Sequence, residues 1–346
     1  MKTEKNSTNR SPIAEKIISE LTEIIKKKII DIRDIKKAKI RAEELEATIS
    51  SEKELARLDP LHAVYVYGQN KMSVLVEQLA ELPVVAKLAD AYTLADQEYM
   101  PAGPPLSPLT YSYFSCWAFF DLCVESTRES FGSIAIEVCK ALEVDKGLIR
   151  IFKKMQASRM GLYVHEGFFG QHVMLREFLT EKRIRAIVPS GHRGEPGEIW
   201  LARIMPEPFE ELPLGYSVVF TTPYIIGMVR EKLFYQVSPQ TEWQAFFERT
   251  LKKTGGKNDT TAYEELMKYG LSRHYWNEYI FEAYVNYTQE AILLTGFPDI
   301  PLSRPHSKES FRKSDKVKNP AAELRGIKKG SLGKLLHREI SDEIRP

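Results

Sequence analysis

The stretch Tyr163–Gly191, which reads YVHEGFFGQHVMLREFLTEKRIRAIVPSG, decides the fold of this chain. Its side chains alternate with a period of two residues. Tyr163 and His165 fall on one side of an extended backbone, and Val164 and Glu166 fall on the other. Before residue 160 the apolar residues recur every three to four positions instead. This change of period predicts that a helical chain gives way to β-strands near residue 160.

Five short runs in and after this stretch are typical of consecutive strands. They are rich in Val, Ile, Phe and Trp, and turns that contain Gly, Pro or Thr-Glu-Lys separate them. The predicted strands cover residues 161–166, 172–179, 183–188, 198–205 and 217–222. Five strands in some sixty residues predict a small barrel or a strongly curled sheet, because closure removes exposed strand edges.

The segments on both sides of these strands have a helical pattern. Ser11 and Pro12 form a typical N-cap and first-turn pair, and a run over residues 110–126 that is apolar on all sides predicts the centre of the core. A further helix is expected from Ser272 to residue 295. The fold class is therefore predicted to be α+β: a mainly helical protein with an inserted small antiparallel β-barrel or curled sheet of about five strands.

This pattern divides the chain into five expected regions. They are a long amphipathic basic helix or helical hairpin (1–57, with a bend near residues 49–51), a helical core domain (58–160), a small β-barrel (161–237), a helical segment packing on the core (238–297) and a basic flexible tail (298–346).

The apolar stripe of the N-terminal helix needs a cover, either from this protein or from a partner. A surface for a protein partner is predicted on one set of its side chains: Ile17, Leu21, Ile24 and Ile32. The favoured function is accordingly that of a non-enzymatic interaction or regulatory protein, which binds a protein partner through its helical body and its small β-barrel.

Charge supports an alternative function. The net charge of +2 divides into +3 for residues 1–57, −7 for the middle of the chain and +6 for residues 303–346. Basic ends on an acidic body can contact nucleic acid, an acidic protein or the body itself. The candidate nucleic-acid contacts lie on the N-terminal helix and in the tail: Lys27, Lys28, Lys36, Lys37, Arg312, Lys313, Lys328 and Lys329.

Two histidines raise a second alternative, a metal-dependent hydrolase. His165 and His172 flank the turn of the first predicted hairpin, and Glu166 or Asp121 would be a further acidic group. A zinc or iron site needs at least three converging ligands, and the third is not supplied nearby. The simpler interpretation is two exposed histidines on one face of a sheet, with Asp121 pointing outward from its helix because a buried carboxylate needs a partner.

A glycine-rich loop follows the third predicted strand. Its sequence, SGHRGEPGE, resembles a hairpin tip, and its side chains His192 and Arg193 are the expected contacts if a ligand touches the loop. It lacks the spacing of a phosphate-binding loop.

Composition and missing motifs narrow the function further. Three cysteines lie in apolar helical segments without a CxxC pair, and no apolar run reaches the length of a membrane span. A cytoplasmic protein without a membrane contact and without a cofactor is therefore expected. The familiar local signatures of nucleotide-binding, hydrolytic and metalloprotease sites are lacking, which favours binding over catalysis.

Overall fold

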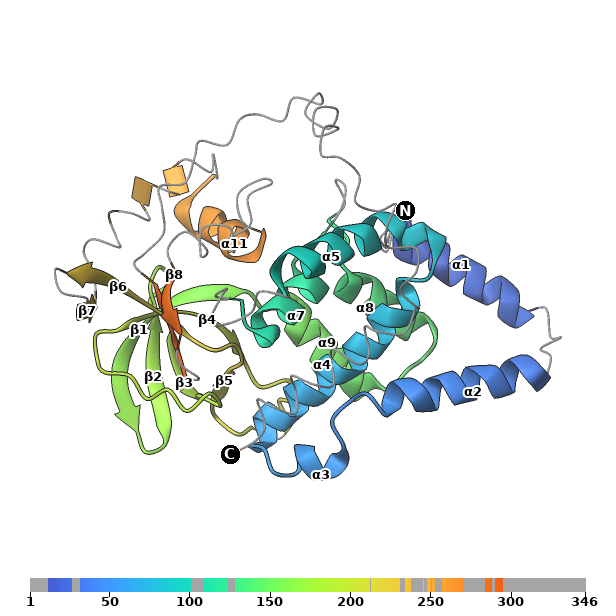
Figure 1. The fold of residues 1–346 in the computed structure, drawn as a ribbon, viewed down its shortest axis with the longest axis horizontal. Coiled ribbons are helices and arrows are strands. Elements are labelled where there is room, and N and C mark those ends of the chain that lie inside the picture. Colours follow the sequence, from blue (N-terminus) through green and yellow to red (C-terminus); the bar gives the residue numbers. More distant parts are fainter. Residues whose placement is uncertain are drawn as a thin grey trace, which may run out of the picture.

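A computed structural model describes residues 12–26, 32–100, 109–123, 128–211, 213–230, 234–237, 245, 248–249, 251–252, 257–269, 284–287 and 290–294. A helical body occupies the centre of the molecule, a β-barrel lies at one end, and two helical arms project at the other (Figure 1). The tail that contains Arg312, Lys313, Lys328 and Lys329 lies outside the described residues.

The helical elements follow the predicted order closely. They are α1 (Pro12–Lys26), α2 (Ile32–Glu46), α3 (Glu52–Leu55), α4 (Pro60–Leu79), the 3-10 turn η1 (Pro83–Val85), α5 (Ala86–Tyr99), α7 (Tyr111–Phe120), α8 (Phe131–Ala141), α9 (Lys146–Ala157) and α11 (Asp259–Tyr269). Side-chain caps fix several of their starts. Asp59, for example, accepts hydrogen bonds from the backbone N–H groups of Leu61 and His62 at 2.9 and 3.3 Å.

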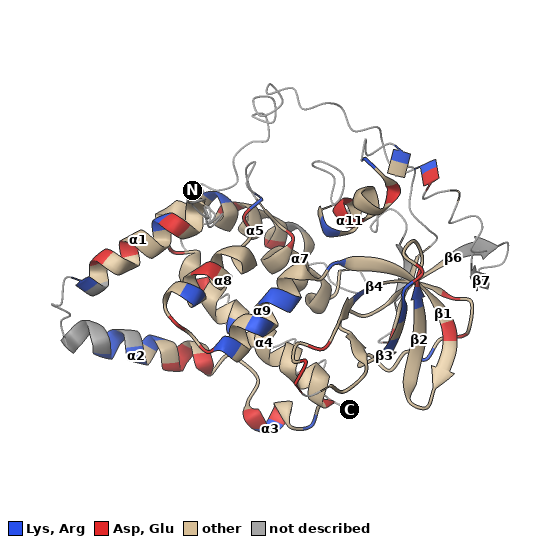
Figure 2. Cartoon of the chain, turned by 180° about the vertical axis from the view of Figure 1, so that it is seen from behind, with Lys and Arg blue, Asp and Glu red and all other residues tan. Residues whose placement is uncertain are grey.

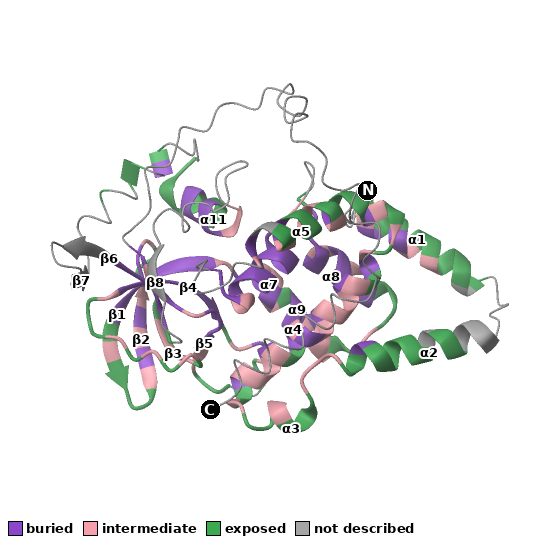
Figure 3. Cartoon of the chain, viewed as in Figure 1, coloured by how far each residue is buried: buried purple, intermediate pink, exposed green. Residues whose placement is uncertain are grey.

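Helix α7 is the centre of the core, as its composition predicted. Every residue from Tyr113 to Phe120 is buried, and burial is densest where α4, α7, α8 and α9 meet (Figure 3). Aromatic rings dominate this region: Phe119 stacks on Tyr92 with 6.2 Å between ring centroids, and Phe131 meets Tyr92 edge to face at 6.3 Å.

The described N-terminal segment contains two helices, α1 and α2, which lie as two separate arms (Figure 1). Helix α1 is fixed to the body: the carboxylate of Glu129 accepts hydrogen bonds from the backbone of Ile13 and Ala14 at 2.9 and 3.2 Å. Helix α2 is not embedded in the same way. Of the side chains that the structure describes in α2, Leu45 alone is buried.

The five predicted strands all form, and they close into a barrel. They are β1 (Met160–Phe169), β2 (His172–Glu177), β3 (Arg183–Ile187), β4 (Ile199–Met205) and β5 (Ser217–Val219). Pairing runs around the ring in the order β1-β2-β3-β5-β4 and returns from β4 to β1. Because β4 lies beside β1, the spatial order β4-β1-β2-β3 is that of a Greek key.

The barrel is mixed rather than antiparallel, which corrects the prediction. Strand β5 enters the gap between β3 and β4, runs antiparallel to β4 and is therefore parallel to β3. Its partners along β3 are Ala186 with Ser217 and Ile187 with Val218. The barrel interior contains Tyr163, Val173, Leu175, Ala186, Trp200 and Ala202.

Further strands continue the sheet from β4: β6 (Tyr224–Arg230), β7 (Phe234–Val237), β8 (Tyr284–Tyr287) and β9 (Ile292–Leu294). The predicted helix over residues 272–295 is wrong in its C-terminal half, since β8 and β9 form there. Strand β9 pairs in parallel with β6, and Ile292 and Leu294 are buried. Apolar runs of this length are ambiguous between helix and buried strand, and here sheet pairing decides the outcome.

A buried ionic cluster joins the body, the barrel and α11. Asp121, at the end of α7, pairs with Arg203 of β4, and its Oδ1 lies 2.7 Å from Nζ of Lys268 of α11. Asp121 and Arg203 are 4% and 1% exposed. The prediction that Asp121 points outward is therefore wrong, because two cations from distant parts of the chain compensate its burial.

None of the helices in the described part of the chain is both long enough and apolar enough to span a lipid bilayer.

Candidate functional site

The outer surface of the barrel around β2 and β3 carries a cluster of aromatic and arginine side chains. We name it the outer barrel face, and its residues are Phe169 at the end of β1, His172 of β2, Arg183 and Arg185 of β3, and Tyr216 just before β5. Strand pairing places them together, since Phe169 lies opposite His172, and Arg185 lies two positions after Arg183 on β3. The alternate residues of the same strands, Val173, Leu175 and Ala186, are buried inside the barrel. The period of two therefore sorts this cluster to the outside.

Phe169 is the most prominent apolar side chain of the barrel. It is 65% exposed, at the end of the β1–β2 hairpin. The guanidinium of Arg185 lies 5.9 Å from its ring centroid, within the range of a cation–π contact. One face of an aromatic ring is thus held beside a cation in open solvent.

Arg185 is held in place by the loop between β4 and β5. Its Nε and Nη2 both donate to the carbonyl oxygen of Gly215, at 2.9 and 2.5 Å. Gly215 has φ +75°, and a Cβ atom there would lie 2.8 Å from Nη2 of Arg185. The backbone conformation favours glycine at this position, and a larger residue would also displace the end of the Arg185 side chain.

Tyr216 forms a second ring on this face and links it to the helical body. Its ring centroid lies 4.8 Å from that of His172, and its hydroxyl donates to Oδ2 of Asp59 at 2.9 Å. Burial and the hydrogen bond to the Asp59 carboxylate raise the pKa of Tyr216 to about 12. The phenol consequently keeps its proton and its donor role at neutral pH.

Arg183 supplies the most accessible charge of the outer barrel face. Its side chain is 71% exposed, and its Nε donates to Glu166 at 2.9 Å. Glu166 also accepts from Arg176 at 2.8 Å. Desolvation opposes ionisation of Glu166, but the hydrogen bonds from Arg183 and Arg176 outweigh it and hold the pKa of this carboxyl below its usual value.

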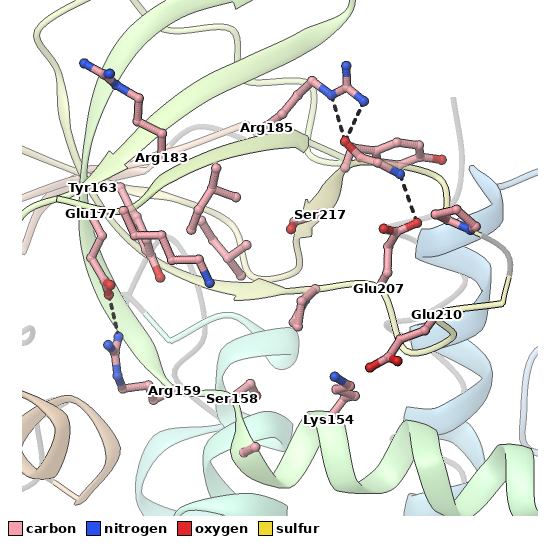
Figure 4. A pocket seen from close by; sticks show the side chains of 18 of the residues that line it. Lys154, Ser158, Arg159, Tyr163, Glu177, Arg183, Arg185, Glu207, Glu210 and Ser217 are labelled. Atoms are coloured by element: carbon pink, nitrogen blue, oxygen red, sulfur yellow. Dashed lines mark hydrogen bonds and ion pairs between the residues drawn. The ribbon is translucent and has the colours of Figure 1, made fainter. Parts of the chain in front are cut away.

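A cleft of about 800 Å³ adjoins this face, between α9, the barrel and residues 206–210 and 213–216 (Figure 4). Several of its charged groups have partners within the lining. Arg159 donates to Glu177 at 2.8 Å and pairs with Glu264, while Glu207 accepts from the backbone of Gly215 at 3.0 Å. These contacts stabilise the junction between body and barrel.

The two histidines of the predicted metal site do not converge. His165 lies opposite Leu175, on the inner side of the sheet, whereas His172 lies on the outer side. His165 is 1% exposed and packs against Trp200, so the interpretation of two exposed histidines on one face is wrong. Within the described ranges, no three His, Cys, Asp or Glu side chains are arranged to hold a metal ion.

The glycine-rich loop lies against the mouth of the barrel. Nε2 of His192 and Nε1 of Trp200 lie 3.1 and 2.7 Å from the same carboxylate oxygen of Glu198. The guanidinium of Arg193 lies 4.8 Å from the ring centroid of Phe168. The loop is therefore anchored at His192, and Arg193 projects beside an aromatic ring.

The predicted partner stripe is divided by the fold. Ile17 is 1% exposed, and Leu21 is partly buried against the body, so this protein's own helices cover them. Ile24 is 57% exposed. Ile32 begins α2, and its side chain lies outside the described set.

The candidate basic contacts divide similarly. Lys36 and Lys37 are exposed on α2, while Lys27 and Lys28 lie outside the described residues. Figure 2 shows basic residues both on α2 and on β2 and β3, at opposite ends of the molecule. Of these two basic regions, only the one on the barrel has aromatic side chains beside its cations among the described residues.

Comparisons with protein family models, curated proteins and solved structures found no match to this chain. Sequence reasoning did not single out the outer barrel face. Its signal was present as Arg183 and Arg185 two residues apart in a predicted strand, and as Phe169 beside a turn glycine. The contribution of Tyr216 could not be anticipated, because it depends on the parallel pairing of β5 with β3.

Proposed function

We propose that this protein binds a single strand of nucleic acid on the outer barrel face. The observation that carries the proposal is the exposed ring of Phe169 next to the guanidinium of Arg185. Arg183, two residues before Arg185 on β3, adds a guanidinium that pairs with Glu166 and is still 71% exposed. A base can stack on the free face of the phenyl ring, and the arginines can contact the phosphate backbone.

The alternatives fit these residues less well. A duplex offers no unstacked base to an aromatic ring, so exposed rings on an open surface favour a single strand. One class of small five-stranded Greek-key barrels binds oligonucleotides or oligosaccharides on strands 2 and 3. This analogy between folds supports the location of the proposed site on β2 and β3. Arginines that are unneeded for a neutral sugar favour the oligonucleotide.

Nucleic-acid binding was the alternative function predicted from the sequence. The proposed binding site now lies on the barrel and not on the basic N-terminal helix and the tail. A protein partner at the N-terminal stripe is the weaker proposal, because Ile17 packs inside the body. Binding requires no catalytic group, and the protein is proposed to be non-enzymatic.

Fluorescence anisotropy of labelled single-stranded RNA and DNA of about 12 nucleotides tests the proposal on the full chain. Phe169→Ala should weaken binding by about 1–3 kcal/mol, the usual contribution of one stacked base. Arg183→Ala should weaken binding and reduce its dependence on salt between about 50 and 200 mM by roughly one phosphate contact.

Matched controls exist on the helices. Tyr67 on α4 is exposed with Lys71 over its ring, at 5.8 Å, so Tyr67→Ala removes a similar pair from the helical body. The double substitution of Lys36 and Lys37 by Ala removes charge from the arm. Both controls should change the Kd by less than about twofold, within the usual effect of surface substitutions.

Three results would contradict the proposal. They are an absence of binding at low salt, Phe169→Ala binding as tightly as the wild type, and an arm variant that loses as much affinity as Arg183→Ala. Binding of an acidic peptide or an oligosaccharide in place of nucleic acid would also overturn it.

A further inference from the structure

We infer that the strand continues over the β1–β2 hairpin tip to a second stacking position, formed by Phe168 and Arg193. This inference rests on the proposed function and extends it to a loop outside the outer barrel face. Phe168 and Phe169 are consecutive in β1, so their rings point to opposite sides of the hairpin. Each ring has its own guanidinium beside it.

The pair on the second side is accessible. Phe168 is 40% exposed, and the guanidinium of Arg193 lies 4.8 Å from its ring centroid. Among the described residues, no carboxylate forms an ion pair with Arg193, whereas Arg183 and Arg176 share Glu166. The charge of Arg193 is therefore available for a phosphate.

A buried histidine positions Arg193 through its backbone. Nδ1 of His165 accepts a hydrogen bond from the N–H of Gly167 at 3.1 Å, so the proton of the neutral ring is on Nε2. That Nε2 donates to the carbonyl oxygen of Arg193 at 3.1 Å. Burial lowers the pKa of His165, which preserves this neutral form at neutral pH. The loop is thereby held while the guanidinium stays free.

The route between the two positions is open. Gly170 forms the hairpin tip with φ +63°, and a Cβ atom there would meet nothing within 4 Å. A strand that stacks on Phe169 can therefore cross the tip beside Gly170 and reach Phe168. The ligand is then a single strand that spans both sides of the hairpin, within the site size of about 4–16 nucleotides that small barrels cover.

A length series tests the inference with the full-length protein. Labelled oligonucleotides of about 4, 8, 12 and 16 nucleotides are titrated with the wild type, Phe169→Ala, Arg193→Ala and Arg193→Lys. Arg193→Ala should weaken binding of the longest strands about tenfold and leave the shortest unchanged. Arg193→Lys, which keeps the charge but loses the planar group, should give an intermediate loss. Phe169→Ala should weaken binding at every length.

The control is Glu195→Ala, an exposed residue of the same loop, which should retain the gain in affinity with strand length. Thermal unfolding shows whether Arg193→Ala remains folded. If it does not, Arg193→Lys alone serves, and an unchanged affinity for long strands in that variant overturns the inference. An equal loss at all lengths also overturns it.

The proposed function and this inference fail in different ways. A wild type that binds no strand of any length refutes both. A wild type whose affinity depends on Phe169 but not on Arg193 refutes only the second stacking position.

Discussion

The barrel and the arm formed by α2 are both rich in charge, but they hold it differently. On the barrel, Arg185 is fixed by two hydrogen bonds to Gly215 and lies beside an aromatic ring. On α2, Lys39 has a single weak pairing with Glu43 at 3.9 Å and a side chain that is 76% exposed. Cations that are held in a fixed orientation beside aromatic rings can form a binding site. Cations on a solvated helix contribute mainly to the long-range electrostatic field of the protein.

The two regions also differ in how they join the rest of the molecule. The barrel is tied to the body by the buried cluster of Asp121, Arg203 and Lys268. Helix α2 has exposed ion pairs, including Arg41 with Glu81 at 2.5 Å. Substitutions at the two junctions should therefore differ in their effect on the free energy of unfolding.

The largest effect is expected for Asp121→Ala. The substitution leaves Arg203 and Lys268 buried without their carboxylate, and loss of one member of a buried ion pair costs about 3–5 kcal/mol. Urea unfolding of the full chain measures the change. Asp90→Ala, an exposed residue on α5, is the control and should stay within about 0.5 kcal/mol of the wild type. A small effect of Asp121→Ala would show that the barrel does not depend on this link.

A smaller effect on the free energy of unfolding is expected for substitution of a buried residue in α1, and almost none is expected for substitution of an exposed residue in α2. Ile17→Ala should lower the free energy of unfolding by about 2–4 kcal/mol, because it removes a side chain that is 1% exposed. Ile40→Ala on α2, where the side chain is 57% exposed, should change it by less than about 0.5 kcal/mol. Both are measured by urea unfolding. A large loss from Ile40→Ala at higher protein concentration only would instead indicate that α2 is covered by a second chain.

The smallest expected effect is a loss of stability at acid pH. His62 lies at the junction of body and barrel, where its ring meets Phe220 edge to face with 6.1 Å between centroids. Burial lowers the pKa of His62 to about 4. The unfolded chain takes up this proton near pH 6.5 while the folded chain does not, so the stabilising contribution is full above pH 6.5 and declines as the pH falls toward 4.

Between pH 7 and 5 this histidine should account for a loss of the order of 1–2 kcal/mol, since each unit of pKa shift corresponds to about 1.4 kcal/mol. The measurement is the difference in urea midpoint between the wild type and His62→Gln across that range. Parallel curves for the two proteins would disprove the assignment. Carboxylates with lowered pKa values, such as Glu198, act in both proteins alike.

The sequence predicted elements better than their partners. The spacing of the five short runs between turns, together with alternation in the first of them, predicted the barrel strands, and the apolar run of α7 predicted the core. Pairing was harder, because nothing local to residues 217–219 indicates that this strand inserts between β3 and β4. The helix expected over residues 272–295 was wrong at residues 284–287 and 292–294 for a similar reason, since sheet pairing overrides local preference there.

The same limit applied to the site. Asp121 was expected to face solvent because its compensating charges are far along the chain, with Arg203 82 positions away. His165 and His172 were close in sequence, but the hairpin begins at Phe169 and His172, later than expected, and the register separates them. The residue types at these positions could be read from the sequence. Which of their side chains lie close together depends on the register of the strands, which the sequence does not show.

The position of β5 in the ring has a consequence for synthesis. Strands β1 to β4 emerge from the ribosome before β5, so β3 and β4 present unpaired edges until residues 217–219 have been made. Exposed edges can pair with other chains. A nascent chain that stalls or is cleaved before this short segment would thus carry an incomplete barrel with strand edges that can pair with other chains. Residues 217–219 therefore contribute strongly to protection against aggregation, although they are only three.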